Sequence, residues 1–328
     1  VAERTAGAVF EAGPIDISSL NRIVLAVSGG SDSTALLHFT YDHWVRTLRR
    51  DKALLCVVTI YHGVRQEAAI EAQAVARKCA ELGIVHHTID WDGRAVKSGF
   101  LEAARHVRYE KLSAVAKAFG NAVVVTGHTL DDQLETLTMR AARSAVGRGM
   151  AGIAPATLYE RQTWFVRPML HLRRQFLRDQ LIERDIGWFD DPSNVDEKYE
   201  RVRVRQGGFD DPTGLLQRAE EEASKRIYDA KQAAGWIEEH VSLSSSAINT
   251  FSASVPVEAL SEEATLDGIS FLCMLVGKQS DRPHSDKVRR AIEACRQRNG
   301  MSFTLAGCQL RRVNDHIQIA TEPRNSRK

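Results

Sequence analysis

Ser28-Gly29-Gly30-Ser31-Asp32-Ser33 is the most informative segment of this chain for its fold. It follows an apolar run, residues 23–27, that is typical of a buried parallel strand, and it leads into residues 34–39, which continue as a helix. The paired glycines let the backbone approach phosphate oxygens closely, and the N–H groups at the helix start face the same way. The serine hydroxyls add donors. Strand, glycine turn and helix in this order therefore predict an anion site.

The loop contains no lysine, so it is not a Walker A sequence. Asp32 within an anion site makes sense mainly if a divalent cation joins its carboxylate to a polyphosphate. The plainer alternative is an ordinary strand-to-helix turn in which Ser or Asp caps the helix. Residues further along the chain decide between the two.

Composition sets broad limits on the class of protein. The 328 residues suffice for two domains, and 43% hydrophobic with 26% charged residues is ordinary for a globular protein. A net charge of +2 neither demands nor excludes a nucleic-acid partner. The five cysteines include no CxxC pair, which leaves zinc and iron–sulfur sites without support. With no long apolar run and no signal-peptide core, we expect a cytoplasmic protein and no membrane partner.

Strand and helix patterns alternate through about residue 143. The apolar runs cover residues 23–27, 53–60, 84–89 and 122–126, and the helical patterns cover residues 33–49, 66–82, 101–119 and 130–143. This alternation predicts an α/β fold with a doubly wound parallel sheet. Ligands of such sheets bind beyond the carboxyl ends of the strands, where residues 28–33, 61–65 and 127–132 fall.

The sequence also predicts a second, smaller and mainly helical domain. Glycines and aspartates at residues 207–212 resemble a hinge, so we place the domains at 1–206 and 207–328. Its expected elements are helices near residues 215–237, 259–276 and 286–298 and strands at 302–305, 309–313 and 317–320, with a polar break at 242–246. A further helix, near residues 172–185, is expected at the end of the first domain.

Candidate catalytic side chains cluster after the fourth strand. Asp132 and Glu135 are three residues apart, so both carboxylates lie on one helix face. Such a pair can hold a metal, receive a cationic substrate or act as a base, and His128 can contact phosphate or move a proton. Acidic residues in a first helical turn also simply favour the helix dipole. Arg105 and Arg108 share another helix face and are candidates for binding phosphate.

In this order the segments resemble the PP-loop superfamily, the N-type ATP pyrophosphatases, and most closely its tRNA(Ile)-lysidine synthase family. The superfamily loop SGGxDS is complete at residues 28–33, and the family segment GHHxDDQxET corresponds to residues 127–136. The family segments DHGLR, AAR…RY, RP and DxSN…RNRIR correspond to residues 61–65, 103–109, 167–168 and 191–205. Three positions depart from the pattern: Tyr61 replaces Asp, Thr129 replaces the second His, and Val202 replaces Asn.

The resemblance implies ATP and Mg²⁺ as cofactors, and a tRNA(Ile) with a CAU anticodon and free L-lysine as partners. ATP would adenylate the C2 oxygen of the wobble cytidine, and the ε-amine of lysine would then displace AMP to give lysidine. Asp32 would hold Mg²⁺, while Arg105 and His128 would stabilise the α-phosphate. Asp132 and Glu135 would receive the lysine ammonium, and one of them would take its proton.

RNA contacts are expected from a run of arginines. Arg201, Arg203 and Arg205 alternate with valines, so as a strand they would present one basic face. A solvated arginine-rich surface is the plainer alternative. The second domain is a further expected tRNA contact. The oligomeric state stays open, with a homodimer among the options.

Two other classes of function are compatible with the sequence. One is a different PP-loop ATP pyrophosphatase acting on RNA or on a small molecule. A tRNA thiolase would need paired cysteines, and a small-molecule ligase would not account for the arginine run. Another is a non-catalytic nucleotide- or RNA-binding module, against which the complete loop and the Asp132/Glu135 pair argue.

Overall fold

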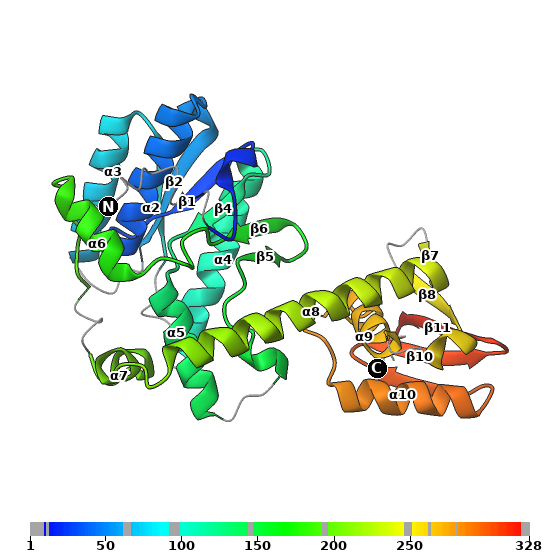
Figure 1. The fold of residues 1–328 in the computed structure, drawn as a ribbon. Coiled ribbons are helices and arrows are strands. Elements are labelled where there is room, and N and C mark those ends of the chain that lie inside the picture. Colours follow the sequence, from blue (N-terminus) through cyan, green and yellow to red (C-terminus); the bar gives the residue numbers. More distant parts are fainter. Residues whose placement is uncertain are drawn as a thin grey trace. The chain divides into compact units, whose positions relative to one another are not determined.

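The computed structural model describes residues 10, 13–61, 67–91, 99–143, 147–191, 196–245, 251–261, 264–279 and 281–322. The chain divides into two compact units, Val1–Glu221 and Glu222–Lys328 (Figure 1). Within the described residues, no helix is long and apolar enough to cross a membrane.

The first unit is built on a six-stranded sheet in the order β3-β2-β1-β4-β6-β5. Its strands are β1 (Ile23–Ala26), β2 (Leu55–Tyr61), β3 (Val85–Asp90), β4 (Val123–Thr126), β5 (Ala156–Tyr159) and β6 (Thr163–Val166). All neighbours pair in parallel except the edge strand β5, which runs antiparallel to β6. The doubly wound parallel sheet expected from the sequence is confirmed, whereas the short strand β5 was not predicted.

Helices lie between these strands and after the last of them, mostly close to the predicted positions. They are α2 (Ser31–Thr40), α3 (Glu67–Leu82), α4 (Phe100–Ala118), α5 (Leu130–Ala142), α6 (Arg174–Glu183), α7 (Glu200–Gly207) and α8 (Pro212–His240). Short helical turns cover Ile17–Ser19, Lys52–Leu54 and Gly147–Met150. The single helix expected over residues 33–49 is instead α2 followed by a π-helical segment, Tyr41–Thr47.

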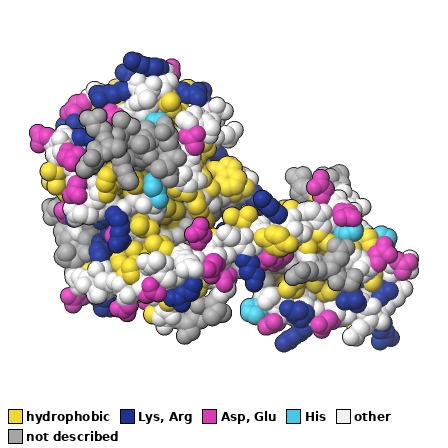
Figure 2. Space-filling model, viewed as in Figure 1, with side chains coloured by type: hydrophobic (Ala, Val, Ile, Leu, Met, Phe, Trp, Pro, Cys, Tyr) yellow, Lys and Arg dark blue, Asp and Glu magenta, His cyan; other side chains and the backbone are white. Residues whose placement is uncertain are grey.

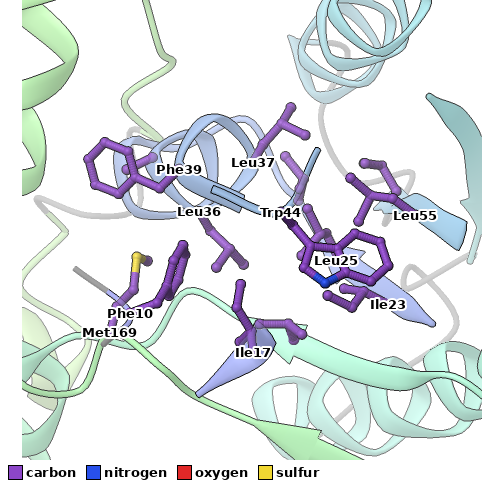
Figure 3. Close-up of a cluster of buried hydrophobic side chains, with 14 of the residues drawn as sticks. Phe10, Ile17, Ile23, Leu25, Leu36, Leu37, Phe39, Trp44, Leu55 and Met169 are labelled. Carbon is purple, nitrogen blue, oxygen red and sulfur yellow. The ribbon is translucent and has the colours of Figure 1, made fainter. Parts of the chain in front are cut away.

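Both faces of the central part of the sheet are buried, as is typical of a parallel sheet. Successive residues of β1 point to opposite faces: Ile23 and Leu25 belong to one apolar cluster and Val24 to another. The first cluster, drawn in Figure 3, packs β1 against α2, α3 and α6 and contains the fully buried Trp44. The second packs the opposite face against α4 through Leu112. This explains why β1, β2 and β4 are almost continuously apolar, whereas the edge strand β3 is largely exposed.

The strand order places the predicted polar loops at one point. The order in which strands are added to the sheet reverses between β1 and β4, which pair directly with Ile23 opposite Val123 and Ala26 opposite Thr126. Such a reversal opens a crevice at the carboxyl ends of the two strands. Residues 28–33 leave β1 there, and residues 127–132 leave β4 beside them.

One prediction about the local structure was wrong. The segment containing Arg201, Arg203 and Arg205 is the helix α7 and not a strand. On a helix, residues four apart share a face, whereas residues two apart point in different directions. Arg201 and Arg205 therefore lie together and Arg203 points elsewhere. The alternation of Arg and Val resembles a strand pattern, but Val202 is a buried packing residue of the helix α7.

The second unit contains a five-stranded antiparallel sheet in the order β7-β8-β11-β10-β9. Its elements after α8 are β7 (Ser242–Ser245), β8 (Phe251–Pro256), a turn at Glu258–Ser261, α9 (Thr265–Val276), α10 (Ser285–Gln297), β9 (Ser302–Leu305), β10 (Cys308–Val313) and β11 (His316–Thr321). The last three strands were predicted. β7 and β8 were not predicted. β7 lies in the polar break, and in β8 serines alternate with the buried Ala253 and Val255, which makes the strand less apolar.

The two units divide inside α8, later in the chain than the predicted boundary at residues 206 and 207. The reason is packing. Leu215 and Ala219, in the first turns of α8, join a buried cluster with Leu137 of α5 and Met150. These turns therefore belong to the first unit.

The second unit yields a stability prediction at Gly277. A Cβ added there would lie 1.9 Å from the carbonyl oxygen of Ala306 and 2.9 Å from that of Cys273, both of which are backbone atoms. We expect Gly277→Ala to lower the free energy of unfolding by about 1–3 kcal/mol, measured by scanning calorimetry. Gly235→Ala is the control, because a Cβ on this exposed residue of α8 meets no described atom within 4 Å. It should instead stabilise by roughly 0.5–1 kcal/mol, and a similar loss in both variants would contradict the packing at Gly277.

Candidate active site

The glycine loop after β1 is held in shape by its own hydroxyl groups. Ser33 Oγ accepts from the Ser28 amide at 3.2 Å and donates to the Gly30 carbonyl at 3.0 Å. Gly29 has φ of +93°, a left-handed conformation that glycine adopts without strain. Gly30 caps α2 and has no side chain with which to satisfy the first N–H groups of the helix. The loop therefore presents unpaired helix N–H groups, as expected for an anion site.

A segment far along the chain supports this loop. The amide of Phe189 donates to the Gly29 carbonyl at 3.0 Å. Arg178 of α6 donates to Ser31 Oγ at 3.3 Å and pairs with Asp190 at 2.8 Å. Sequence reasoning did not identify this support, because nothing in the local pattern of α6 indicates which loop it meets.

Asp32 lies in the first turn of α2 and is partly buried. Its Oδ2 accepts from Arg174 Nε at 2.9 Å, and Ser31 Oγ donates to its Oδ1 at 3.2 Å. Burial raises the pKa of Asp32 above its ordinary value, and the guanidinium of Arg174 offsets only part of this.

The start of α5 is fixed by a capping box. Buried Thr129 donates its amide and its hydroxyl to Asp132 Oδ2 at 2.8 and 3.0 Å, and the Asp132 amide returns a long bond of 3.5 Å to Thr129 Oγ1. A threonine can make this cap where the family pattern has histidine. Burial opposes ionisation of Asp132, but His128, Arg174 and the Thr129 amide outweigh it, so the pKa of Asp132 lies below its ordinary value.

The two loops approach each other closely at Gly127. A Cβ on this residue would lie 3.0 Å from the carbonyl oxygen of Asp32. The first turn of α2 and the start of α5 are therefore in direct backbone proximity.

Glu135 is the most buried charged group of the site, with no exposed side-chain surface. Its Oε1 accepts from Arg205 Nε at 2.9 Å and from Arg174 Nη1 at 3.4 Å, and Arg201 Nε lies 3.6 Å from Oε2. A buried carboxylate needs such compensation, because an unpaired charge in the interior is costly. Glu135 is thus surrounded by three guanidinium groups.

Arg174 is a site residue whose place among the carboxylates sequence reasoning did not predict. From the first turn of α6 its guanidinium contacts three carboxylates, those of Asp32, Asp132 and Glu135, at 2.9, 3.4 and 3.4 Å. Its amide donates to Asp131 Oδ2 at 2.7 Å, which anchors the backbone. In the sequence it is one of two adjacent arginines, and only the fold distinguishes it from Arg173.

His128 stands beside this carboxylate cluster. Its Nδ1 lies 2.9 Å from Thr126 Oγ1 at the end of β4. Burial lowers the pKa of His128 to about 4, and the positive charges of Arg167, Arg201 and Arg105 act in the same direction. The imidazole is therefore neutral at physiological pH.

Arg105 is exposed on α4 and rests against Tyr109. Its guanidinium lies 5.1 Å from the centre of the Tyr109 ring and donates to the hydroxyl at 3.3 Å. The same hydroxyl accepts from buried Arg167 at 2.9 Å. Arg105 is near enough to influence His128 electrostatically, but its hydrogen bond goes to Tyr109 and not to the glycine loop.

Several predicted residues come together and others do not. Asp32, His128, Asp132 and Glu135 form one cluster, with Arg201 and Arg205 added through Glu135. Arg203 instead donates to the backbone carbonyls of Glu197 and Lys198. The predicted contacts at residues 62–65 and 192–194 lie outside the described residues.

The described residues offer no cluster of three or more His, Cys, Asp or Glu side chains that could hold a metal ion. Asp32 provides a single carboxylate beside an anion loop. That donor set suits Mg²⁺, which is commonly held by one or two carboxylates together with substrate phosphates and water.

Known proteins resemble parts of this chain. The PP-loop domain family matches residues 3–209. The tRNA(Ile)-lysidine synthase of Mesorhizobium japonicum is 54% identical over 187 residues, which are 56% of this chain and 41% of that protein. The tRNA(Ile)-lysidine synthase of Brucella ovis is 42% identical over 196 residues, 59% of this chain and 43% of that protein. The matched stretch thus spans about two fifths of the length of these relatives.

Among solved structures, a U34-tRNA thiolase of Methanococcus maripaludis is similar, with a TM-score of 0.54 and 13% identity. The likeness covers 68% of this chain and 79% of that chain, and at this identity it shows the fold alone.

The contacts of Glu135 predict different consequences for two neighbouring arginines. Arg205→Met removes the shortest partner of a buried carboxylate, so the free energy of unfolding should fall by about 1–3 kcal/mol in denaturant titrations. Arg203→Met removes only bonds from an exposed side chain to backbone carbonyls, and it should change stability by less than about 0.5 kcal/mol. Equal effects would mean that α7 does not orient Arg205 toward Glu135.

The neutral state of His128 predicts a pH dependence of stability. The unfolded chain binds a proton at His128 below its ordinary pKa of 6.5, whereas the folded chain resists protonation until about pH 4. Stability is therefore lost as the pH falls through this window, by at most about 1.4 kcal/mol per pH unit. His128→Gln should flatten the pH profile of the unfolding free energy between pH 6.5 and 4. The control His106→Gln, at an exposed position on α4, should leave the profile unchanged.

Proposed function

The chain belongs to the PP-loop domain family, and on that basis we propose that it is an ATP-dependent ligase that modifies tRNA. Its reaction joins the ε-amine of L-lysine to C2 of the wobble cytidine in a tRNA(Ile) with a CAU anticodon. The products are lysidine, AMP and pyrophosphate. The observation that carries this proposal is the 54% identity to a tRNA(Ile)-lysidine synthase over 187 residues.

The first step is adenylation. The loop after β1 binds the β- and γ-phosphates of ATP through its N–H groups and serine hydroxyls. The C2 oxygen of cytidine attacks the α-phosphorus, and pyrophosphate leaves. Arg105 and His128 are the candidates for contacting the α-phosphate, Arg105 as a cation and neutral His128 as a hydrogen-bonding group. Asp32 would hold Mg²⁺, which supplies positive charge to the polyphosphate.

The second step is attack by the amine. The ε-nitrogen of lysine forms a bond to C2 of the activated base, and the C2–O bond breaks to release AMP. A protonated amine has no lone pair, so the ammonium must first be bound and deprotonated. Asp132, ionised and partly exposed, is the first candidate to receive it. Glu135 is the second, although its carboxylate is enclosed by arginines in this structure.

RNA contacts are proposed on both units. Arg203 is exposed on α7 and is the arginine of its run that does not contact Glu135. On the second unit, Figure 2 shows Lys and Arg side chains, mixed with acidic ones, along the part that α10 occupies. The exposed basic residues of α10 are Lys287, Arg289, Arg290 and Arg296. Because the proposed substrate is a tRNA, we also propose a cytoplasmic location.

The test is a reaction of the purified chain with Mg-ATP, L-lysine and a tRNA(Ile) transcript carrying CAU. Mass spectrometry of the digested nucleosides should find a cytidine that has gained lysine, dependent on ATP. Asp32→Asn should lose tRNA-dependent ATP–pyrophosphate exchange by at least about 100-fold, because the Mg-polyphosphate loses a charged ligand. Asp51→Asn, in an exposed turn before β2, is the matched control and should react normally.

Other outcomes would contradict parts of the proposal. AMP release without a lysine adduct would keep a PP-loop enzyme and reject lysine as the acceptor. No nucleotide turnover with any tRNA would favour a binding module. Full exchange activity in Asp32→Asn would remove Asp32 from the metal-binding role.

A further inference from the structure

Arg174 occupies the position that a substrate ammonium would need. Its guanidinium contacts Asp132 and Glu135, the two carboxylates proposed to receive lysine, at 3.4 Å each. It also contacts Asp32 on the nucleotide loop at 2.9 Å. A single side chain therefore connects the proposed amine site to the proposed nucleotide site.

The charge balance of the cluster depends on this side chain. The carboxylates of Asp32, Asp132 and Glu135 are opposed by the guanidinium groups of Arg174, Arg201 and Arg205, so the cluster is neutral. A neutral cluster attracts an ammonium ion weakly. Removal of Arg174 leaves one uncompensated negative charge, which matches a single ammonium.

The guanidinium of Arg174 can leave these carboxylates while its backbone stays in place. Its amide is fixed by the 2.7 Å bond to Asp131, whereas its contacts to Asp132 and Glu135 are long. The side chain can thus change partners without displacing α6. Guanidinium groups bind phosphate in the same bidentate way as carboxylate. ATP on the loop would bring phosphate oxygens next to Asp32, which Arg174 already reaches.

We propose, on the basis of the proposed function, that Arg174 is a positioning residue that couples the two substrates. When ATP binds, its guanidinium passes from Asp132 and Glu135 to the phosphates, and the amine site opens. L-Lysine therefore binds tightly only after the nucleotide. By thermodynamic reciprocity, lysine strengthens nucleotide binding by the same factor.

The experiment measures equilibrium binding of radiolabelled L-lysine to the full chain, with and without Mg²⁺ and a non-hydrolysable ATP analogue. For the unmodified chain, lysine affinity should rise at least about tenfold with the analogue, a coupling of about 1.4 kcal/mol. In Arg174→Met the side-chain length is kept and the cation is lost. Lysine should then bind equally well with and without the analogue.

Two further variants control for structural damage. Arg173→Met removes the neighbouring arginine, which pairs with Asp131, and it should keep the full nucleotide dependence. Arg174→Lys keeps the positive charge and loses the planar fork, so it should keep part of the dependence. This variant is informative even if Arg174→Met folds poorly, because a purely structural role gives a uniform loss of affinity with unchanged coupling.

The possible failures are distinguishable. Lysine that binds the unmodified chain equally with and without the analogue overturns the coupling and leaves the proposed function intact. Persistent coupling in Arg174→Met overturns the role of Arg174. Lysine that binds no variant, while the analogue binds all of them, overturns the proposed acceptor and this inference with it.

Discussion

A carboxylate with no exposure to water must be neutralised by neighbouring cations, and Glu135 imposes this constraint on the first unit. Arg174 and Arg205, which neutralise Glu135, lie 39 and 70 residues further along the chain. Meeting this requirement brings α6 and α7 against the start of α5. The constraint thus shapes the carboxyl edge of the sheet, where the site lies.

The same charges give the site its functional character. Its acidic groups, which would attract Mg²⁺ and an amine, are occupied by internal cations instead. An unliganded site with three unpaired carboxylates would destabilise the fold, because like charges in a partly buried cluster repel one another. A cationic ligand that binds these carboxylates would therefore replace an arginine as their partner. Its strength depends on where the displaced arginine goes.

Sheet topology supplies the frame for this chemistry. Direct pairing of β1 with β4 brings the glycine loop and the start of α5 together, and Gly127 permits their close approach. The family departure at Thr129 is accommodated within this frame, because its hydroxyl completes a capping box with Asp132. A side chain of a different type therefore serves the same helix start. Val202 is likewise absorbed as a buried contact of α7.

Sequence patterns alone were enough to predict the parallel sheet, most helix positions, the strand–glycine turn–helix arrangement and the PP-loop family, which the match over residues 3–209 confirms. These features depend on local signals: apolar runs, glycine turns and short motifs. Strand β5, the helical state of α7 and the contacts of Arg174 emerged only from the folded chain. Arg173 and Arg174 have the same local sequence pattern. Only Arg174, however, contacts three carboxylates from two other helices. Ion pairs between distant segments leave no periodic trace in a sequence, because they depend on where the folded chain returns.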